Sequence, residues 1–141
     1  MTLSVADKLR QAGLRPTSQR MVLANHLFRH GHKHVTAEAL HEAISTVGEK
    51  VALATVYNTL HQFTDAGLLR QIVIEAGKSY FDTNVTAHHH FYYEDENRLE
   101  DIPFERISVV LDGQDPKMAE PPKGMRVSQV DVIVRLRSDQ A

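Results

Sequence analysis

The feature that most constrains the fold is a series of short helical segments that ends in a hairpin. Residues 3–12, 17–30, 36–47 and 53–66 are each typical of a helix, and each is followed at once by glycine. Glycine favours the left-handed conformation just past a helix end, and Thr17 and Thr36 are suitable N-caps. Two apolar segments then flank the turn Glu-Ala-Gly-Lys, which predicts a hairpin. Helices followed by a hairpin predict a winged helix-turn-helix.

The segment 53–66 has two contrasting faces. The apolar face, predicted to be buried, contains Leu53, Val56, Leu60 and Phe63. The opposite face is polar but short-chained, with no Lys or Glu, and it contains Ala54, Thr55, Asn58, His61 and Gln62, with Tyr57 at its flank. A merely solvated face usually carries more charge, so the pattern favours a contact surface. In winged helices this last helix enters the major groove of DNA.

Strand patterns replace the helical ones beyond a predicted hinge at 84–87. Strands are expected at 89–93, about 106–111 and 126–137, the last with Val130, Val132, Val134 and Leu136 on one face. So small a sheet buries little surface alone, so we expect it to pair with a second copy. The domains expected are 1–83 for DNA binding, 84–87 as hinge and 88–141 for dimerisation and metal or haem sensing.

Charge and cysteine content narrow the function. Residues 1–83 carry 9 Lys and Arg against 7 Asp and Glu, whereas residues 84–141 carry 7 against 11. A mildly basic front half suits a DNA-binding domain joined to a separate module. The chain has no cysteine, which excludes disulfides and thiolate metal sites. It also lacks a signal core and an apolar run of transmembrane length, so we expect a cytoplasmic protein without a membrane partner.

A histidine-rich stretch, "TAHHHFYYEDE", suggests a metal site, a haem site or a polar edge strand. Strand alternation places His88 and His90 on one side and His89 on the other. The metal-ligand candidates are His34, Asp82, His88, His90 and Asp101. Nitrogen and oxygen ligands without sulfur suit Mn²⁺, Fe²⁺ or Zn²⁺. His88, His89 and His90 are also candidate axial ligands for haem, beside three aromatic residues.

Five motifs together resemble the ferric uptake regulator family: "GLRPTSQR", "HVTAEAL", "LATVYNTLHQFTDAGLL", "GKSYFD" and "HHHF". The lack of cysteine and the segments "DIPFERISVV" and "PPKGMRVSQVDVIVRLR" resemble its iron response regulator branch. The resemblance implies an α+β fold, with an N-terminal winged helix-turn-helix and a small C-terminal β-rich α/β dimerisation domain. It also implies a homodimeric transcriptional regulator of iron- or haem-responsive genes.

The resemblance assigns DNA contacts to five positions. Tyr57 would contact bases, and Thr55 would contact phosphate. Asn58 stands where relatives commonly have Arg. An amide side chain pairs with adenine, whereas Arg pairs with guanine, so Asn58 favours adenine at that contact. Arg15 would enter the minor groove of an A·T-rich operator, and Lys78 would meet phosphate from the wing. The expected partner is an operator of inverted-repeat character.

The resemblance also implies that the five candidate ligands hold one regulatory ion between the domains. Binding there would fix the hinge and, in a dimer, the spacing of the two copies of the DNA-contacting helix at 53–66. Relatives usually hold a structural zinc with two Cys-x-x-Cys pairs, but the first pair falls on Tyr93 and Glu96, so we expect no tetrathiolate zinc. The family's dimerisation helix is also hard to place, because residues 103–124 are proline-rich and alternating.

Two alternatives belong to other classes. A small His/Asp metalloenzyme would need an open coordination position and a positioned acid or base. The sequence contains no separate general-base or nucleophile motif, and an enzyme would leave the winged helix unexplained. A haem or metal buffer protein meets the same objection, so a DNA-binding regulator is the favoured interpretation.

Overall fold

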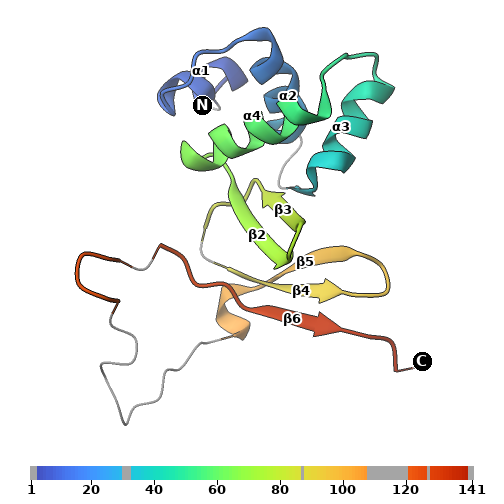
Figure 1. The fold of residues 1–141 in the computed structure, drawn as a ribbon, viewed down its shortest axis with the longest axis vertical. Helices are drawn as coiled ribbons and strands as arrows, with labels where there is room; N and C mark the ends of the chain where they lie inside the picture. Colours follow the sequence, from blue (N-terminus) through green and yellow to red (C-terminus); the bar gives the residue numbers. More distant parts are fainter. Residues whose placement is uncertain (1–2, 30–32, 87, 108–120, 127, 140–141) are drawn as a thin grey trace. The chain divides into compact units, whose positions relative to one another are not determined.

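The computed structural model describes residues 3–29, 33–86, 88–107, 121–126 and 128–139. The chain divides into two compact units, residues 1–86 and residues 87–141 (Figure 1). Within the described ranges, no helix is both long and apolar enough to span a bilayer. The α+β class expected from the sequence is confirmed.

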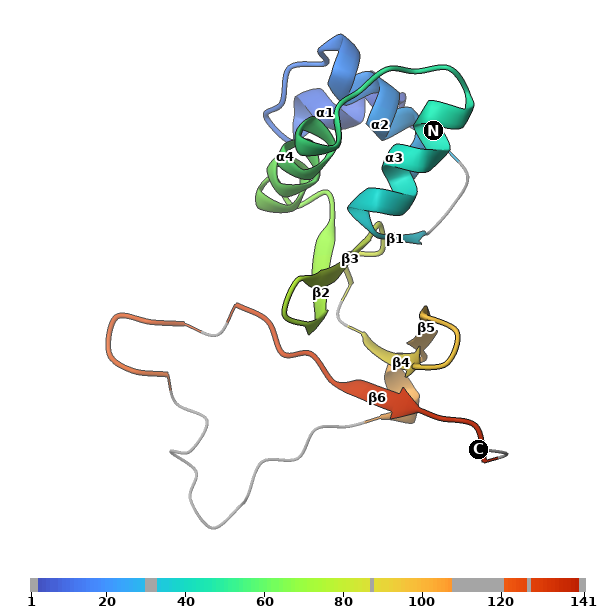
Figure 2. The same cartoon turned by 45° about the vertical axis from the view of Figure 1, so that its right-hand side comes forward.

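Four helices form most of the first unit: α1 Val5–Gln11, α2 Ser18–Phe28, α3 Ala37–Thr46 and α4 Leu53–Asp65 (Figures 1 and 2). Ser4, Thr17 and Thr36 cap the first three, each accepting the backbone N–H of the residue three positions on. The threonine caps were predicted, whereas the Ser4 cap was not. The second helix ends at Phe28, earlier than expected, and residue 30 lies outside the described ranges.

A three-stranded antiparallel sheet completes the first unit in the order β1-β3-β2, with β1 His34–Val35, β2 Arg70–Glu75 and β3 Lys78–Asp82. The predicted hairpin is β2–β3. Gly77 occupies its turn at φ +76°, a conformation that glycine adopts without strain. The short strand β1 was not predicted, and it aligns His34 with Asp82 across the sheet.

The core of this unit contains the apolar side chains of all four helices and the sheet. Val56, Leu60 and Phe63 of α4 are completely buried, as the helical spacing predicted. One expectation was wrong, since Leu53 is 37% exposed because it begins the helix. The helix α3 ends at Thr46, one residue before its predicted end, and Val47 is 73% exposed.

The second unit is a three-stranded sheet in the order β5-β4-β6 (Figure 1). Its strands are β4 His89–Tyr93, β5 Arg98–Ile102 and β6 Ile133–Leu136, and a 3-10 turn, η1, covers Phe104–Arg106. Strand β4 pairs antiparallel with β5 and parallel with β6. Tyr92, Leu99 and Ile102 are its buried apolar residues among those described.

The strand predictions for this unit were partly wrong. The first, 89–93, matches β4, but β5 was not predicted. In the predicted strand 106–111, residue 106 ends the 3-10 turn and residues 108–111 lie outside the described ranges. The predicted strand 126–137 is shortened to β6, and Val130 is 53% exposed. The alternation of Val130, Val132, Val134 and Leu136 begins before Ile133, where the pairing of β6 with β4 begins.

Candidate metal ligands and nucleic-acid surface

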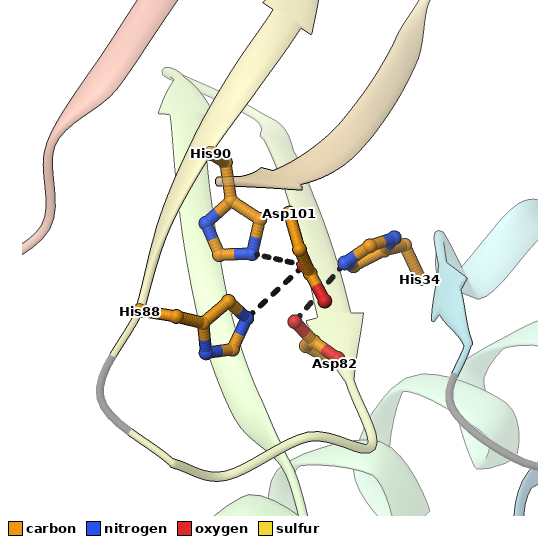
Figure 3. Close-up of side chains that lie close together, drawn as sticks. All are labelled: His34, Asp82, His88, His90 and Asp101. Atoms are coloured by element: carbon orange, nitrogen blue, oxygen red, sulfur yellow. Dashed lines mark ion pairs between the residues drawn. The ribbon is translucent and has the colours of Figure 1, made fainter. Parts of the chain in front are cut away.

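In the first unit, the β1–β3 pairing brings two candidate ligands together. The His34 Nε2 atom lies 3.1 Å from Asp82 Oδ2, and the Asp82 side chain is completely buried (Figure 3). Asp82 Oδ1 accepts the backbone N–H of Asn84 at 2.8 Å. Two hydrogen bonds between Lys33 and Thr83 extend the pairing beside the ligands, so the pair is held from both strands.

In the second unit, three candidate ligands converge. The Nε2 atoms of His88 and His90 lie 3.1 Å and 3.2 Å from the same oxygen of Asp101, Oδ1 (Figure 3). His90 is completely buried and His88 nearly so, with ring centroids 4.5 Å apart. The β4–β5 register places Asp101 directly opposite His90. Two buried imidazole nitrogens thus face one carboxylate oxygen, whose side chain is 37% exposed.

These spacings suit a divalent metal. Ligand atoms about 2.1 Å from an ion lie about 3.0 Å apart at right angles, or about 3.4 Å apart at tetrahedral angles. The three Nε2–carboxylate separations, 3.1, 3.1 and 3.2 Å, fall in this interval. The donors are imidazole nitrogens and carboxylate oxygens, a set that binds Mn²⁺, Fe²⁺ and Zn²⁺. Each unit therefore carries imidazole and carboxylate atoms at spacings that suit metal coordination.

His89, the third residue of the histidine run, has a different role. Its Nδ1 accepts the backbone N–H of Val132 at 3.1 Å, while the Val132 carbonyl accepts the backbone N–H of His90. A backbone N–H can only donate, so Nδ1 is the acceptor in this contact. The His89 ring thus joins β4 to the segment before β6, whereas His88 and His90 point to Asp101.

Three of the five candidate DNA-binding residues line an open hollow on the first unit. The hollow has a volume of about 540 Å³ and is lined by the start of α2 and one face of α4. Arg15, Thr55 and Asn58 line it, as do Gln19, Arg20 and Gln62. Three predicted contacts therefore share one surface. Lys78 lies apart from this lining, at the first position of β3 beside the wing turn.

Tyr57 lies outside the lining and contacts α3. Its hydroxyl donates a hydrogen bond to Glu38 Oε1, and its ring is half-buried against the core. The carboxylate acceptor raises the pKa of the Tyr57 phenol, and the donated hydrogen bond lowers the pKa of Glu38. Glu38 was not singled out from the sequence, because helical periodicity carries no signal for a pair 19 residues apart.

Comparisons with known proteins agree on one family. The chain matches the ferric uptake regulator family over residues 11–129. It is 31% identical over 102 residues to the peroxide-responsive repressor PerR of Staphylococcus aureus, covering 72% of this chain and 68% of that protein.

Two solved structures are also similar. The ferric uptake regulator from Pseudomonas aeruginosa with manganese has a TM-score of 0.70 and 25% identity, covering 97% of this chain and 99% of that one. The ferric uptake regulator of Vibrio cholerae has a TM-score of 0.73 and 26% identity, covering 96% and 100%.

These relatives are regulators and a repressor, not enzymes, which removes the metalloenzyme alternative. The winged helix and its polar helix face agree with the DNA-binding character of such regulators. The family match extends over residues of both units and includes all five candidate ligands. This chain therefore belongs to the ferric uptake regulator family.

Proposed function

We propose that this chain is a homodimeric, metal-responsive transcriptional regulator, whose operator binding depends on one divalent ion held by His34, Asp82, His88, His90 and Asp101. The observation that carries the proposal is the convergence of two buried imidazoles on one carboxylate oxygen in the second unit. A complementary imidazole–carboxylate pair lies in the first unit. Neither group alone supplies the four to six ligands that such ions usually take.

The proposed regulation follows from which unit supplies each ligand. His34 and Asp82 belong to the unit that carries α4, and the other three belong to the unit that carries β4. A bound cation can accept a lone pair from each of the five side chains. Ligands from both units would then restrict the predicted hinge at 84–87 and, in a dimer, the spacing of the two α4 helices. The ion shifts operator binding only if its affinity differs between the arrangement of the two units that binds the operator and the arrangement that does not.

Mn²⁺ and Fe²⁺ are the proposed ions, with Zn²⁺ as a competitor of similar ligand preference. The similarity to the Pseudomonas aeruginosa structure with manganese supports this choice. The absence of cysteine rules out tetrathiolate zinc, so tightly held zinc resistant to strong chelation would contradict the ligand assignment. Within the family we place the chain in the iron response regulator branch, on the cysteine-free sequence and its C-terminal segments.

For the operator, we propose that α4 lies in the major groove. Tyr57 and Asn58 would contact bases, Thr55 and Lys78 would contact phosphate, and Arg15 would enter an A·T-rich minor groove. Asn58 is exposed beside Thr55 and Arg15 on the lining of one hollow, which supports a common contact surface. An operator with two half-sites would match a two-fold symmetric dimer.

Electron paramagnetic resonance of free Mn²⁺ tests the ligand set directly. The full chain should bind one Mn²⁺ per protomer, and His34→Gln or Asp101→Asn should each weaken this binding by about 100-fold or more, since even supporting groups contribute 10–100-fold. His41→Gln is a matched control, because His41 lies in α3 outside the proposed set. Unchanged affinity in either ligand variant would overturn the shared site.

Haem sensing is tested separately, by absorbance of the haem-loaded protein. His88 and His90 face Asp101, and the His89 Nδ1 is occupied by Val132, so haem ligation would displace existing contacts. A Soret band that disappears in a variant lacking all three histidines would support haem ligation there. A band that survives the replacement would exclude it.

A further inference from the structure

Arg20 is the side chain that links the two proposed DNA-contacting elements. It lies in the first turn of α2, where its Nε and Nη2 atoms donate to the Gln62 side-chain oxygen at 3.2 Å and 3.1 Å. Its Nη1 atom donates to the backbone carbonyl of Arg15 at 2.9 Å. One planar guanidinium therefore bonds both to α4 and to the segment that precedes α2.

The bond to Arg15 restricts the backbone from which that side chain extends. The Arg15 carbonyl also accepts the backbone N–H of Thr17 at 2.9 Å, so two donors approach the same oxygen. The next residue, Pro16, has a fixed φ and no N–H of its own. The peptide unit after Arg15 is thus held by two hydrogen bonds and a proline ring, while the Arg15 side chain remains exposed.

The bond to Gln62 reaches the polar face of α4. Gln62 lies four residues after Asn58, so the two side chains are neighbours on the helix surface. Both line the same hollow as Arg15 and Thr55. The paired Nε and Nη2 donors also fix the direction of the guanidinium plane, which an ammonium group cannot do.

We propose that Arg20 is a positioning residue for operator recognition, which holds Arg15 at a fixed distance from the exposed face of α4. A minor-groove contact and a major-groove contact can then be made together without ordering the 12–17 segment during binding. This inference rests on the proposed function, because it requires that Arg15 contacts the operator.

A competing role is direct contact between Arg20 and a phosphate. Such a contact would act independently of Arg15, and its loss would reduce the salt dependence of binding by about one counterion. A positioning role instead predicts that the effects of Arg20 and Arg15 depend on each other. The two roles therefore differ in additivity and in salt dependence.

A double-mutant cycle on the full chain separates them. The probe is a duplex that the wild-type protein selects from a random-sequence pool in the presence of Mn²⁺, and the readout is fluorescence anisotropy. We expect R15A and R20M each to weaken binding about tenfold, and R15A/R20M to bind no more weakly than R15A alone. R20M should also lose discrimination against G·C substitutions at the positions where R15A loses it.

Two further variants keep the test independent of stability. Q62M leaves the Arg20 charge in place but removes its acceptor, and R20K keeps the charge without the planar fork; both should reproduce the R20M effect at least in part. R10M is the control for charge loss, since Arg10 is exposed and its side chain donates to Asp7 within α1. The operator affinity of R10M, measured by anisotropy, should depend on the G·C substitutions in the same way as that of wild type.

The outcomes are distinguishable. Additive losses in R15A/R20M, together with a reduced salt slope in R20M, would overturn the positioning role. R20K and Q62M curves identical to wild type would overturn it as well. If the wild-type protein selects no duplex, or R15A binds normally, the failure lies in the proposed function and its DNA contacts instead.

Discussion

At the scale of single residues, carboxylates contact four of the candidate functional side chains, Tyr57 and three histidines. Glu38 accepts from the Tyr57 hydroxyl, Asp82 faces His34, and Asp101 faces His88 and His90. The metal candidates could be chosen from the sequence because imidazole and carboxylate groups are chemically distinctive, and strand alternation separates His89 from His88 and His90. The partners Glu38, Arg20 and Gln62 are ordinary surface residue types, and only the fold brings them together.

The Tyr57–Glu38 hydrogen bond leads to a titration prediction. In E38Q the pKa of Tyr57 should fall back towards its usual value of 10.0, because the carboxylate that favours the protonated phenol is gone. Tyrosine Cζ NMR measures this pKa directly. The control is E42Q, one turn along α3. Equal Tyr57 titration in wild type and E38Q would contradict the hydrogen bond.

The same bond predicts how pH affects stability. Because the pKa of Glu38 is lowered on folding, its contribution exists above the usual value of 4.5 and is lost as pH falls through the lowered value. Because the pKa of Tyr57 is raised, its contribution exists below 10.0 and is lost as pH rises through the raised value. In urea unfolding, the free energy of unfolding of wild type should exceed that of E38Q most clearly between these two pH limits. A difference between the two proteins that does not depend on pH would contradict this.

At the scale of elements, local signals found the helices and the wing. Glycine stops and threonine caps act within a few residues, so they can be recognised without the fold. The strands β1 and β5 were missed because β1 has only two residues and β5 is rich in charge. Each is a strand because a partner, β3 or β4, supplies its hydrogen bonds.

The cap of α3 can be tested by one substitution. Thr36 Oγ1 accepts the Ala39 N–H at 3.1 Å, and T36A should lower the free energy of unfolding by about 1 kcal/mol. S45A is the control, because Ser45 donates to a carbonyl near the end of the same helix and should change stability by less than about 0.5 kcal/mol. Urea unfolding measures both. Equal effects would show that the cap contributes nothing specific.

The hydrogen bond from the segment before β6 to a side chain of β4 depends on His89. Replacing it with Leu removes the acceptor for the Val132 N–H, which should then exchange with solvent at least about tenfold faster. Hydrogen exchange followed by NMR measures this amide. Amides in the β4–β5 ladder are the internal control and should keep their protection. Unchanged exchange at Val132 would show that another group protects it.

At the scale of the whole molecule, the sequence predicted the family and the order of helix and strand regions. The family motifs are continuous segments, so they survive without knowledge of the fold. The ends of strands were harder to predict, because β6 begins at Ile133, where pairing with β4 begins, and not at Val130, where apolar alternation begins. Which ligands share one ion is likewise a property of the assembled chain, not of any one segment.

The small second unit also bears on assembly. Its described core contains few apolar residues, Tyr92, Leu99 and Ile102 among them, so a partner surface would add needed burial. We predict a homodimer, with a mass of twice the chain's 15.9 kDa in light scattering at micromolar concentration. EDTA should leave this mass unchanged, because the proposed ligands all belong to one chain. A monomer under these conditions would contradict the proposed dimer.

The central claim is that one ion, held by both units, controls operator binding. The most direct measurement is fluorescence anisotropy of a selected operator duplex against free Mn²⁺, for wild type, H34Q and H90Q. These variants remove one ligand from each unit. We predict that wild-type affinity for the duplex changes with Mn²⁺ and that both variants lose this response. A variant that responds to Mn²⁺ as wild type does would contradict the shared site.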